Sequence, residues 1–174
     1  MNIEKKQPEN WLRGPVPSIP DLLQPAAHAL LQSLEEIKIY SENFPSEMLY
    51  LKPAGRASVA FHLKHITGVL DRMLTYAKQD TLSKKQFDYL KNESKTDKNG
   101  SILSFIEAFE EKVNEALLYF KTLDPATLTE FRTVGRKKLP TTLIGLLFHA
   151  AEHSQRHVGQ LLVTVSILKK DENQ

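Results

Sequence analysis

Three of the six histidines, His149, His153 and His157, stand four residues apart in the stretch from Thr141 to Leu168. Residues four apart lie above one another on one face of an α-helix, so a helix here arranges the three imidazoles in a row. At about 100° per residue the row lies toward the apolar face of the helix. His157 is nearest the centre of that face, and His149 is furthest from it. Two imidazoles at this spacing can turn toward one point and supply neutral nitrogen ligands to a transition metal ion.

The length of the row limits how many of its rings one ion can use. The Cα atoms of His149 and His157 are about 12 Å apart at a rise of about 1.5 Å per residue, which is too far for all three rings to share one metal. Both neighbouring pairs satisfy the spacing, and helical phase favours His153 with His157. The alternative is a set of histidines that hydrogen-bond to one another in a helix interface without a metal.

A second group of histidines, His62 and His65, lies in the sequence FHLKHI, within a helix expected from about residue 57 to 77. Helical phase points His62 inward and places His65 at the edge of the apolar stripe. One of these two rings, together with His153 and His157, would form a three-histidine site with open positions for water or substrate, as in catalytic metal sites. His28, on an earlier segment, is expected at the surface or behind the ligands.

The elements that must position these rings are four amphipathic helices. Apolar periodicity predicts them at about 21 or 24 to 40, 57 or 58 to 77, 100 to 121 and 141 to 168, the last with Thr141 as its N-cap. Helices of this length pack as a bundle, and bundle cores build metal sites from side chains on facing helices. The expected fold class is therefore all-α: a four-helix bundle with an irregular N-terminal arm and a long polar loop between helices 2 and 3.

The remaining segments are expected to be connections. Residues 1–20 contain four prolines and form the N-terminal arm, which Trp11 and Leu12 are expected to pack onto the domain. Residues 78–99 form the polar, lysine-rich loop, with at most a turn of helix near 87–90, and residues 131–139 form an irregular loop or a small hairpin. The bundle itself should span 21–170, followed by a C-terminal tail at 171–174.

Composition excludes several classes of protein. The chain has 174 residues with 41% hydrophobic content, enough for one domain with its own core. It has no cysteine, so disulfides, thiolate metal sites and cysteine nucleophiles are excluded. No signal peptide or apolar stretch of membrane-spanning length is present, so we expect a cytoplasmic protein without membrane contact. The net charge is +2 with scattered basic residues, and this does not favour binding to nucleic acid.

The pairing of FHLKHI with the later HAAEHSQRHVGQL resembles the DinB-like (DinB/bacillithiol-transferase-type) superfamily of four-helix metal-binding proteins, from about residue 24 to 168. Carried over position by position, the resemblance implies that the metal ligands are His65, followed by Ile66, and His153 with His157, followed by Gly159-Gln160. It selects His65 where helical phase selects His62, and His62 remains the alternative. It implies one divalent transition metal ion, which is Zn, Ni, Mn or Fe.

The resemblance also implies an activity. We expect a metal-dependent thiol S-transferase or a related detoxification enzyme, which acts on a low-molecular-weight thiol and an electrophilic small molecule. We also expect the protein to be a homodimer. Basic residues that would hold the carboxylates of the thiol are Arg72, Arg132, Arg136, Lys137 and Lys138. Glu152 would accept a proton near the metal or form a surface pair. The alternative function is a non-catalytic metal-binding dimeric stress-response protein.

Overall fold

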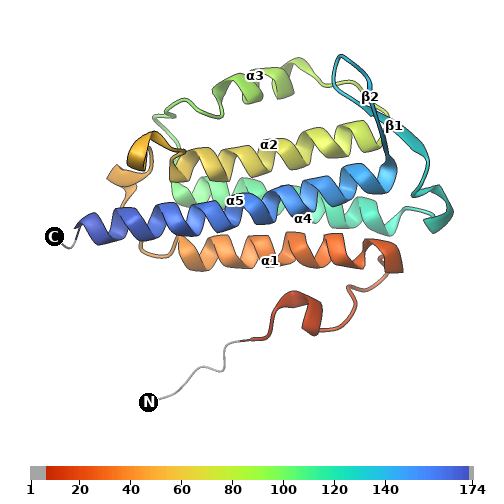
Figure 1. The fold of residues 1–174 in the computed structure, drawn as a ribbon, viewed down its shortest axis with the longest axis horizontal. Coiled ribbons are helices and arrows are strands. Elements are labelled where there is room, and N and C mark those ends of the chain that lie inside the picture. The colour runs from red at the N-terminus through yellow and green to blue at the C-terminus, as the bar shows by residue number, and fades with distance from the viewer. Residues whose placement is uncertain (1–6, 173–174) are drawn as a thin grey trace.

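The computed structural model describes residues 7–172 of the chain. Within them four long helices lie side by side (Figure 1). They are α1 (Gln24–Tyr40), α2 (Val59–Ala77), α4 (Ile102–Lys121) and α5 (Leu143–Glu172). These bounds agree closely with the four helices that apolar periodicity predicts. Short 3-10 helices occupy the connections at Asn10–Leu12, Asp21–Leu23, Ser46–Met48, Pro53–Gly55 and Pro125–Thr127.

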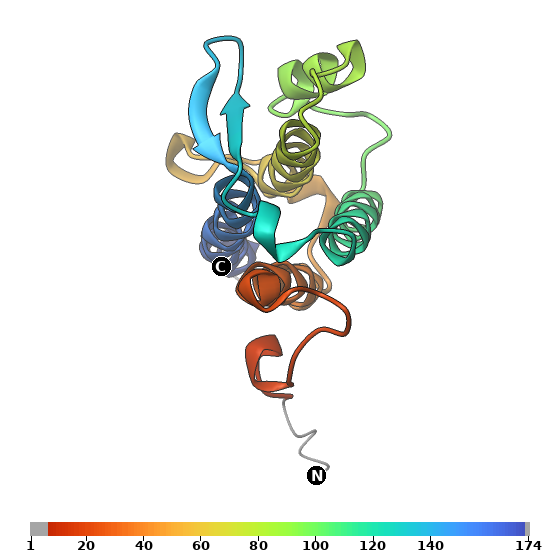
Figure 2. The same ribbon diagram turned by 90° about the vertical axis from the view of Figure 1, so that its right-hand side faces the viewer.

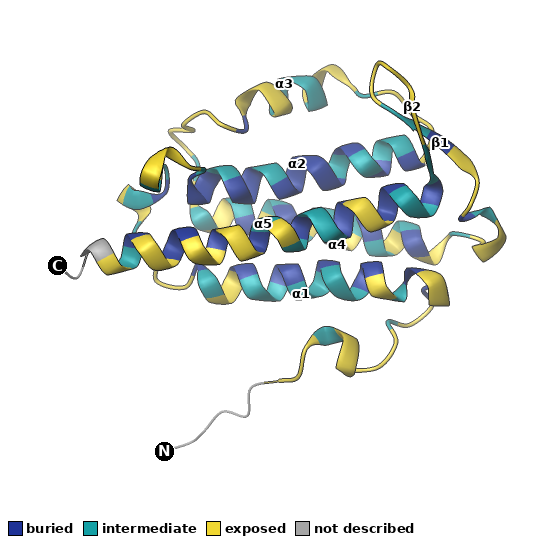
Figure 3. Ribbon diagram, viewed as in Figure 1, coloured by how far each residue is buried: buried dark blue, intermediate teal, exposed yellow. Residues whose placement is uncertain are grey.

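The four long helices enclose one core, because α4 and α5 each pack against both α1 and α2. Figure 2 shows this arrangement in a view along the helices. Leu30 of α1, Leu63 of α2, Phe109 of α4 and Leu147 of α5 are fully buried in this core. Figure 3 shows the buried residues of each helix on the sides that face the other helices. The pairing of α2 with α5 places the two histidine-bearing helices next to each other.

Side-chain caps fix where these helices begin. The Ser58 hydroxyl accepts a hydrogen bond from the backbone N–H of Phe61 at 3.2 Å, at the start of α2. At the start of α5 the Thr142 hydroxyl accepts from the backbone N–H of Gly145 at 3.1 Å. The prediction that Thr141 is the cap was therefore wrong by one residue, because Thr141 pairs with Arg132 in a small sheet.

The lysine-rich segment 78–99 is not the continuous loop that its polarity predicts. It contains a nine-residue helix, α3 (Lys84–Asn92), which packs against α2. Ser83 and Gln86 form a capping box, in which each side chain accepts a hydrogen bond from the backbone N–H of the other residue. These caps satisfy two of the free donors at the helix start, and so they stabilise a helix whose weak apolar pattern gave no clear signal.

A β-hairpin leads into α5. Its strands β1 (Phe131–Val134) and β2 (Leu139–Thr142) are antiparallel, with Phe131 opposite Thr142. Gly135 adopts a φ of 70° at the start of the turn, a conformation that glycine enters without steric cost. The fold is therefore mostly helical with a two-stranded sheet rather than all-α, and the hairpin is the correct one of the two alternatives expected for this segment.

The described part of the N-terminal arm is attached to α1 by polar contacts. Arg13 forms a bidentate pair with Glu35, at 2.8 and 2.9 Å. The expectation that Trp11 and Leu12 pack the arm onto the domain was wrong, because these side chains are 62% and 56% exposed. Residues 1–6 of the predicted arm and 173–174 of the predicted tail lie outside the described residues.

Candidate metal centre

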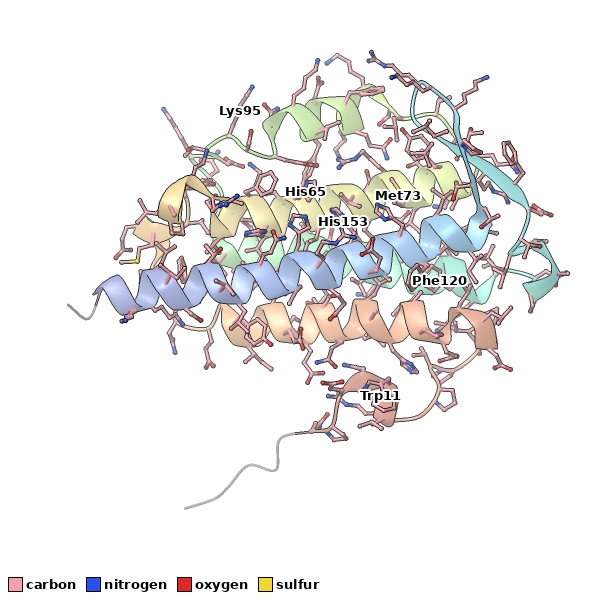
Figure 4. The ribbon with its side chains drawn as sticks, in the orientation of Figure 1. Trp11, His65, Met73, Lys95, Phe120 and His153 are labelled. Atoms are coloured by element: carbon pink, nitrogen blue, oxygen red, sulfur yellow. The ribbon has the colours of Figure 1, made fainter. Side chains whose placement is uncertain are left out.

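The histidines of α2 and α5 meet between the two helices. Figure 4 shows His65 and His153 projecting from α2 and α5 toward one another. The ring centroids of His65 and His157, and those of His153 and His157, are 4.6 Å apart. Those of His65 and His153 are 5.2 Å apart. Imidazoles from two distant parts of the sequence thus converge on one place.

Two short nitrogen–nitrogen contacts connect the helices. Nε2 of His65 lies 3.0 Å from Nε2 of His153, and Nδ1 of His62 lies 3.0 Å from Nδ1 of His157. Since His62 contacts Nδ1 of His157, it leaves Nε2 of that ring for another partner. His62 therefore stands behind His157, on the side away from that nitrogen.

The distances between the ring nitrogens are close to those between two ligands of one metal ion. One nitrogen each of His65, His153 and His157 can be chosen so that all three lie within 4.8 Å of one another. Bonds of about 2.0–2.1 Å at octahedral or tetrahedral angles separate two nitrogen ligands by about 2.8–3.4 Å. The 3.0 Å contact of His65 with His153 already matches this distance. The donor set fits a divalent transition metal ion after small rotations of the rings.

The environment keeps these rings in the form that binds metal. Burial lowers the pKa of His153 to about 4 and that of His157 to about 3, and repulsion from His65 adds to both shifts. Burial likewise lowers the pKa of His62 to about 4. At neutral pH the imidazoles of His62, His153 and His157 are therefore uncharged, so each has a nitrogen lone pair available for a metal ion or for a hydrogen bond.

A buried carboxylate stands behind His65. Oε2 of Glu93 accepts a hydrogen bond from Nδ1 of His65 at 2.8 Å, and Oε1 accepts one from Arg72 at 2.6 Å. Glu93 is only 4% exposed. An imidazole that gives its Nδ1–H to a carboxylate presents Nε2 as a more basic ligand in a fixed orientation, as is usual for metal-bound histidines.

Two residues of α2, besides Arg72, hold Glu93 in this position. Lys64 donates to the carbonyl oxygens of Asn92 and Lys95, on either side of Glu93, at 2.8 Å each. Gly68 has no side chain where the Glu93 carboxylate approaches α2, and a Cβ there would overlap it. The segment that follows α3 is therefore anchored to the turn of α2 that carries His65.

An aromatic ring covers His65 on another side. Phe61 stacks on the His65 imidazole with ring centroids 5.0 Å apart and an interplanar angle of 14°. Nδ1 of His153 is buried, and within residues 7–172 it has no hydrogen-bond partner. The orientation of His153 is therefore set by packing and by its contact with His65.

Other predicted site residues lie outside this cluster. Nδ1 of His149 pairs with Glu152 at 2.9 Å, and Glu152 also accepts from Arg156 at 2.6 Å, so Glu152 forms a surface pair on its own helix. His149, Glu152 and His153 form a second group with metal-binding spacing, but it shares His153 with the first group. His28 is hydrogen-bonded to the carbonyl oxygen of Gly14 at 3.0 Å and serves the N-terminal arm.

The basic residues expected to hold a thiol cosubstrate divide into two groups. Arg72 is buried against Glu93, and Arg132 is buried with its Nε donating to the carbonyl oxygen of Ala77. Both guanidinium groups already have partners within the protein, and Arg132 also lines the cleft that contains Arg136 and Lys138. Arg136 and Lys138 line a cleft of about 500 Å³ between the hairpin and the start of α3, and this cleft contains no histidine. Lys137 is exposed in the same turn.

Sequence reasoning missed Glu93 and Gly68. Glu93 lies in a segment expected to be loop, 28 residues from the ring that it contacts. The sequence did contain a signal for Gly68. A glycine in the middle of a helix costs about 1 kcal/mol relative to alanine, so its presence there indicates that another group packs closely against the helix.

No helix among residues 7–172 has the length and apolar character needed to cross a membrane.

The model of the DinB superfamily matches residues 22–161, which is most of the chain. A crystal structure of a protein from Streptococcus pneumoniae, from the Northeast Structural Genomics Consortium, has a similar fold with a TM-score of 0.64. The two chains are 12% identical, and the match covers 87% of this chain and 91% of that one. Comparison with curated proteins gave no match. With the family model matched over both histidine-bearing helices, the chain belongs to the DinB superfamily.

Proposed function

We propose that His65, His153 and His157 bind one divalent transition metal ion, and that the protein uses it to transfer a low-molecular-weight thiol to an electrophilic small molecule. The observation that carries the proposal is the convergence of three imidazole nitrogens within 4.8 Å, from two helices. Membership of the DinB superfamily, in which metal binding is common, supports it. The four long helices would act as the predicted four-helix bundle, with ligands on the facing helices α2 and α5.

The ligand set favours a reactive site over a closed one. Three protein ligands leave at least one coordination position for an exogenous molecule, and structural metal sites usually fill all four. When bound, a divalent metal ion lowers the pKa of a coordinated thiol and so raises its thiolate fraction at neutral pH. Zn, Ni, Mn and Fe all suit imidazole ligands, so the choice of metal is left to the measurement.

The residues around the ligands have separate tasks in this proposal. Glu93 orients His65 through its 2.8 Å hydrogen bond, and His62 orients His157 through the contact at 3.0 Å. Phe61 shields one face of His65 from water. The thiol loses its proton to solvent and its sulfur forms a bond to the electrophilic carbon. The leaving group, chloride in the case of a chloroarene, departs with the electron pair of the broken bond.

The test begins with untagged protein purified without chelators. Mass spectrometry should find close to one equivalent of metal per chain, and His153→Ala and His157→Ala should lose it. Protein loaded with Co²⁺ should then develop a thiolate charge-transfer band when a thiol is added, and should consume 1-chloro-2,4-dinitrobenzene in a thiol-dependent reaction. Metal-free wild type whose stability does not change on adding Zn, Ni, Mn or Fe would exclude the metal site.

A second candidate is a non-catalytic metal-binding dimer, and exposed apolar side chains on α5 favour it. Phe148 and Val163 are each 58% exposed and Ile167 is 44% exposed. At about 100° per residue these three positions fall on one side of the helix. This candidate predicts a dimer in analytical ultracentrifugation that Val163→Glu dissociates, with one metal per chain and no consumption of thiol.

A further inference from the structure

We infer that a cleft beside the histidine cluster, with Arg56 and Arg156 on its lining, binds the carboxylate groups of a small anionic ligand. This inference rests on the proposed function, in which that ligand is the thiol cosubstrate. The cleft has a volume of about 700 Å³ and lies between the segment before α2 and the middle of α5. Its lining also includes His62, Gly159 and Gln160.

The cleft is connected to the cluster through His62. This residue is 2% exposed, lines the cleft, and contacts Nδ1 of His157 at 3.0 Å. Arg156 directly precedes His157 in the chain and lies one helical turn, about 5 Å along the axis, from His153. None of the three candidate metal ligands lines the cleft, so the sulfur of a ligand held at Arg156 has to extend past His62 to reach them. The cleft at the hairpin has no such connection, because no histidine lines it.

The charges on the lining favour an anion. Two arginines line the cleft and supply its positive charge, and none of the residues that line it is acidic. Among the described side chains, residues 7–170, no ion pair joins Arg56 to a carboxylate. Arg156 is 56% exposed in its side chain and keeps a 2.6 Å contact with Glu152, which leaves further donors of its guanidinium for a ligand. The planar guanidinium matches a carboxylate in a two-point hydrogen bond, whereas lysine supplies only a point charge.

The size of the cleft indicates a ligand larger than the simplest thiols. About 700 Å³ falls in the range of about 300–1,000 Å³ that is usual for small-molecule sites. The space beside Gly159 is empty, because glycine has no side chain and a Cβ at this position would have no heavy atom within 4 Å. The cleft therefore fits a thiol that carries one or two carboxylates, and the neutral amide of Gln160 adds a donor and an acceptor.

The first test measures the anion site without any thiol. Full-length protein, as purified, is titrated by NMR with succinate and, separately, with inorganic phosphate. Succinate should bind to wild type, and its Kd should rise at least tenfold in the double variant Arg56→Gln/Arg156→Gln. Lys52→Gln, which removes an exposed charge four residues before Arg56, is the matched control and should leave the Kd unchanged. Any direct contact of succinate with bound metal is common to all these proteins and cancels in the comparison.

The second test connects the cleft to the cluster. Protein loaded with Co²⁺ is titrated with mercaptosuccinate and with uncharged 2-mercaptoethanol, using the thiolate charge-transfer band. Wild type should bind mercaptosuccinate more tightly, and the double arginine variant should lose this preference while its affinity for 2-mercaptoethanol stays the same. Gly159→Leu, which fills the cleft without changing its charge, should weaken mercaptosuccinate selectively.

The outcomes separate the two proposals. Succinate binding that is unchanged in the double variant would overturn the carboxylate site, and so would binding of phosphate at least tenfold tighter than that of succinate. Arginine-dependent succinate binding in a protein that gives no thiolate band with any thiol would uphold the carboxylate site and overturn the proposed thiol chemistry.

Discussion

Replacing Glu93 by glutamine tests whether the carboxylate behind His65 supports metal binding. The side chain keeps its length and one acceptor oxygen, so Nδ1–H of His65 can still donate to it. The negative charge disappears, and the amide nitrogen is a donor that Arg72 cannot use. Arg72, whose side chain is 9% exposed, then remains buried without its 2.6 Å partner.

The size of both effects follows from this geometry. Removing one partner of a buried ion pair typically destabilises the fold by about 3–5 kcal/mol. A domain of this kind is stable by about 5–15 kcal/mol, so Glu93→Gln should still fold at 25 °C with a clearly lower unfolding midpoint. Loss of an outer carboxylate partner typically lowers metal affinity by about 10–100-fold, which corresponds to about 1.4–2.7 kcal/mol.

The assay is a competition for Zn²⁺ or Co²⁺ against a chromophoric chelator, with urea denaturation of the metal-free protein beside it. Glu115→Gln is the control, because Glu115 pairs with Lys78 and Lys112 on the surface, where its side chain is 42% exposed. Its effect on stability should be below about 1 kcal/mol, with no change in affinity. If folded Glu93→Gln binds metal as tightly as wild type, the role assigned to Glu93 is incorrect.

Four further predictions concern residues of α2, α3 and α5. His65→Ala, like His153→Ala and His157→Ala, should reduce the metal content measured by mass spectrometry to background. His149→Ala should retain one equivalent, because that side chain is 47% exposed and pairs with Glu152. Equal loss of metal in all four variants would contradict the ligand set. Gly68→Ala should lower both stability and metal affinity although alanine is the better helix former by about 1 kcal/mol, because its Cβ would lie 2.8 Å from Arg72 and Tyr89 atoms and displace Glu93. Gly159→Ala places its Cβ in open space, so its free energy of unfolding in urea should instead rise by up to about 1 kcal/mol. A decrease of that size would show that the space beside Gly159 is occupied. Burial raises the pKa of Tyr89 to about 12, above its unfolded value of about 10. The contribution of this shift to the free energy of unfolding is therefore complete below pH 10. It is lost as the pH rises toward 12, at up to about 1.4 kcal/mol per pH unit. Tyr89→Phe should flatten this part of the profile of unfolding free energy against pH, and parallel profiles would refute the assignment.

Most of the helical fold could be predicted from the sequence. The apolar stripes and the serines at positions 58 and 101 place α2 and α4 to within two residues. Of the nine-residue α3 only a turn near 87–90 was predicted, because the segment is polar on average and its stability comes from a capping box and from packing on α2. The arm was misjudged because an exposed tryptophan and a buried one have the same sequence signal.

The sequence by itself determined that His153 and His157 share one face of a helix, because a four-residue spacing fixes this through the geometry of the α-helix alone. Only the tertiary structure decided how the two rings of α2 meet them, since that depends on the rotation of α2 against α5, and helical phase alone had selected His62. In the structure His65 contacts His153 and His62 contacts His157, so the two rings have different partners. Only the tertiary structure also brought Glu93 to His65, because a contact between residues 28 positions apart is set by how the chain returns to α2 and by the space that Gly68 leaves.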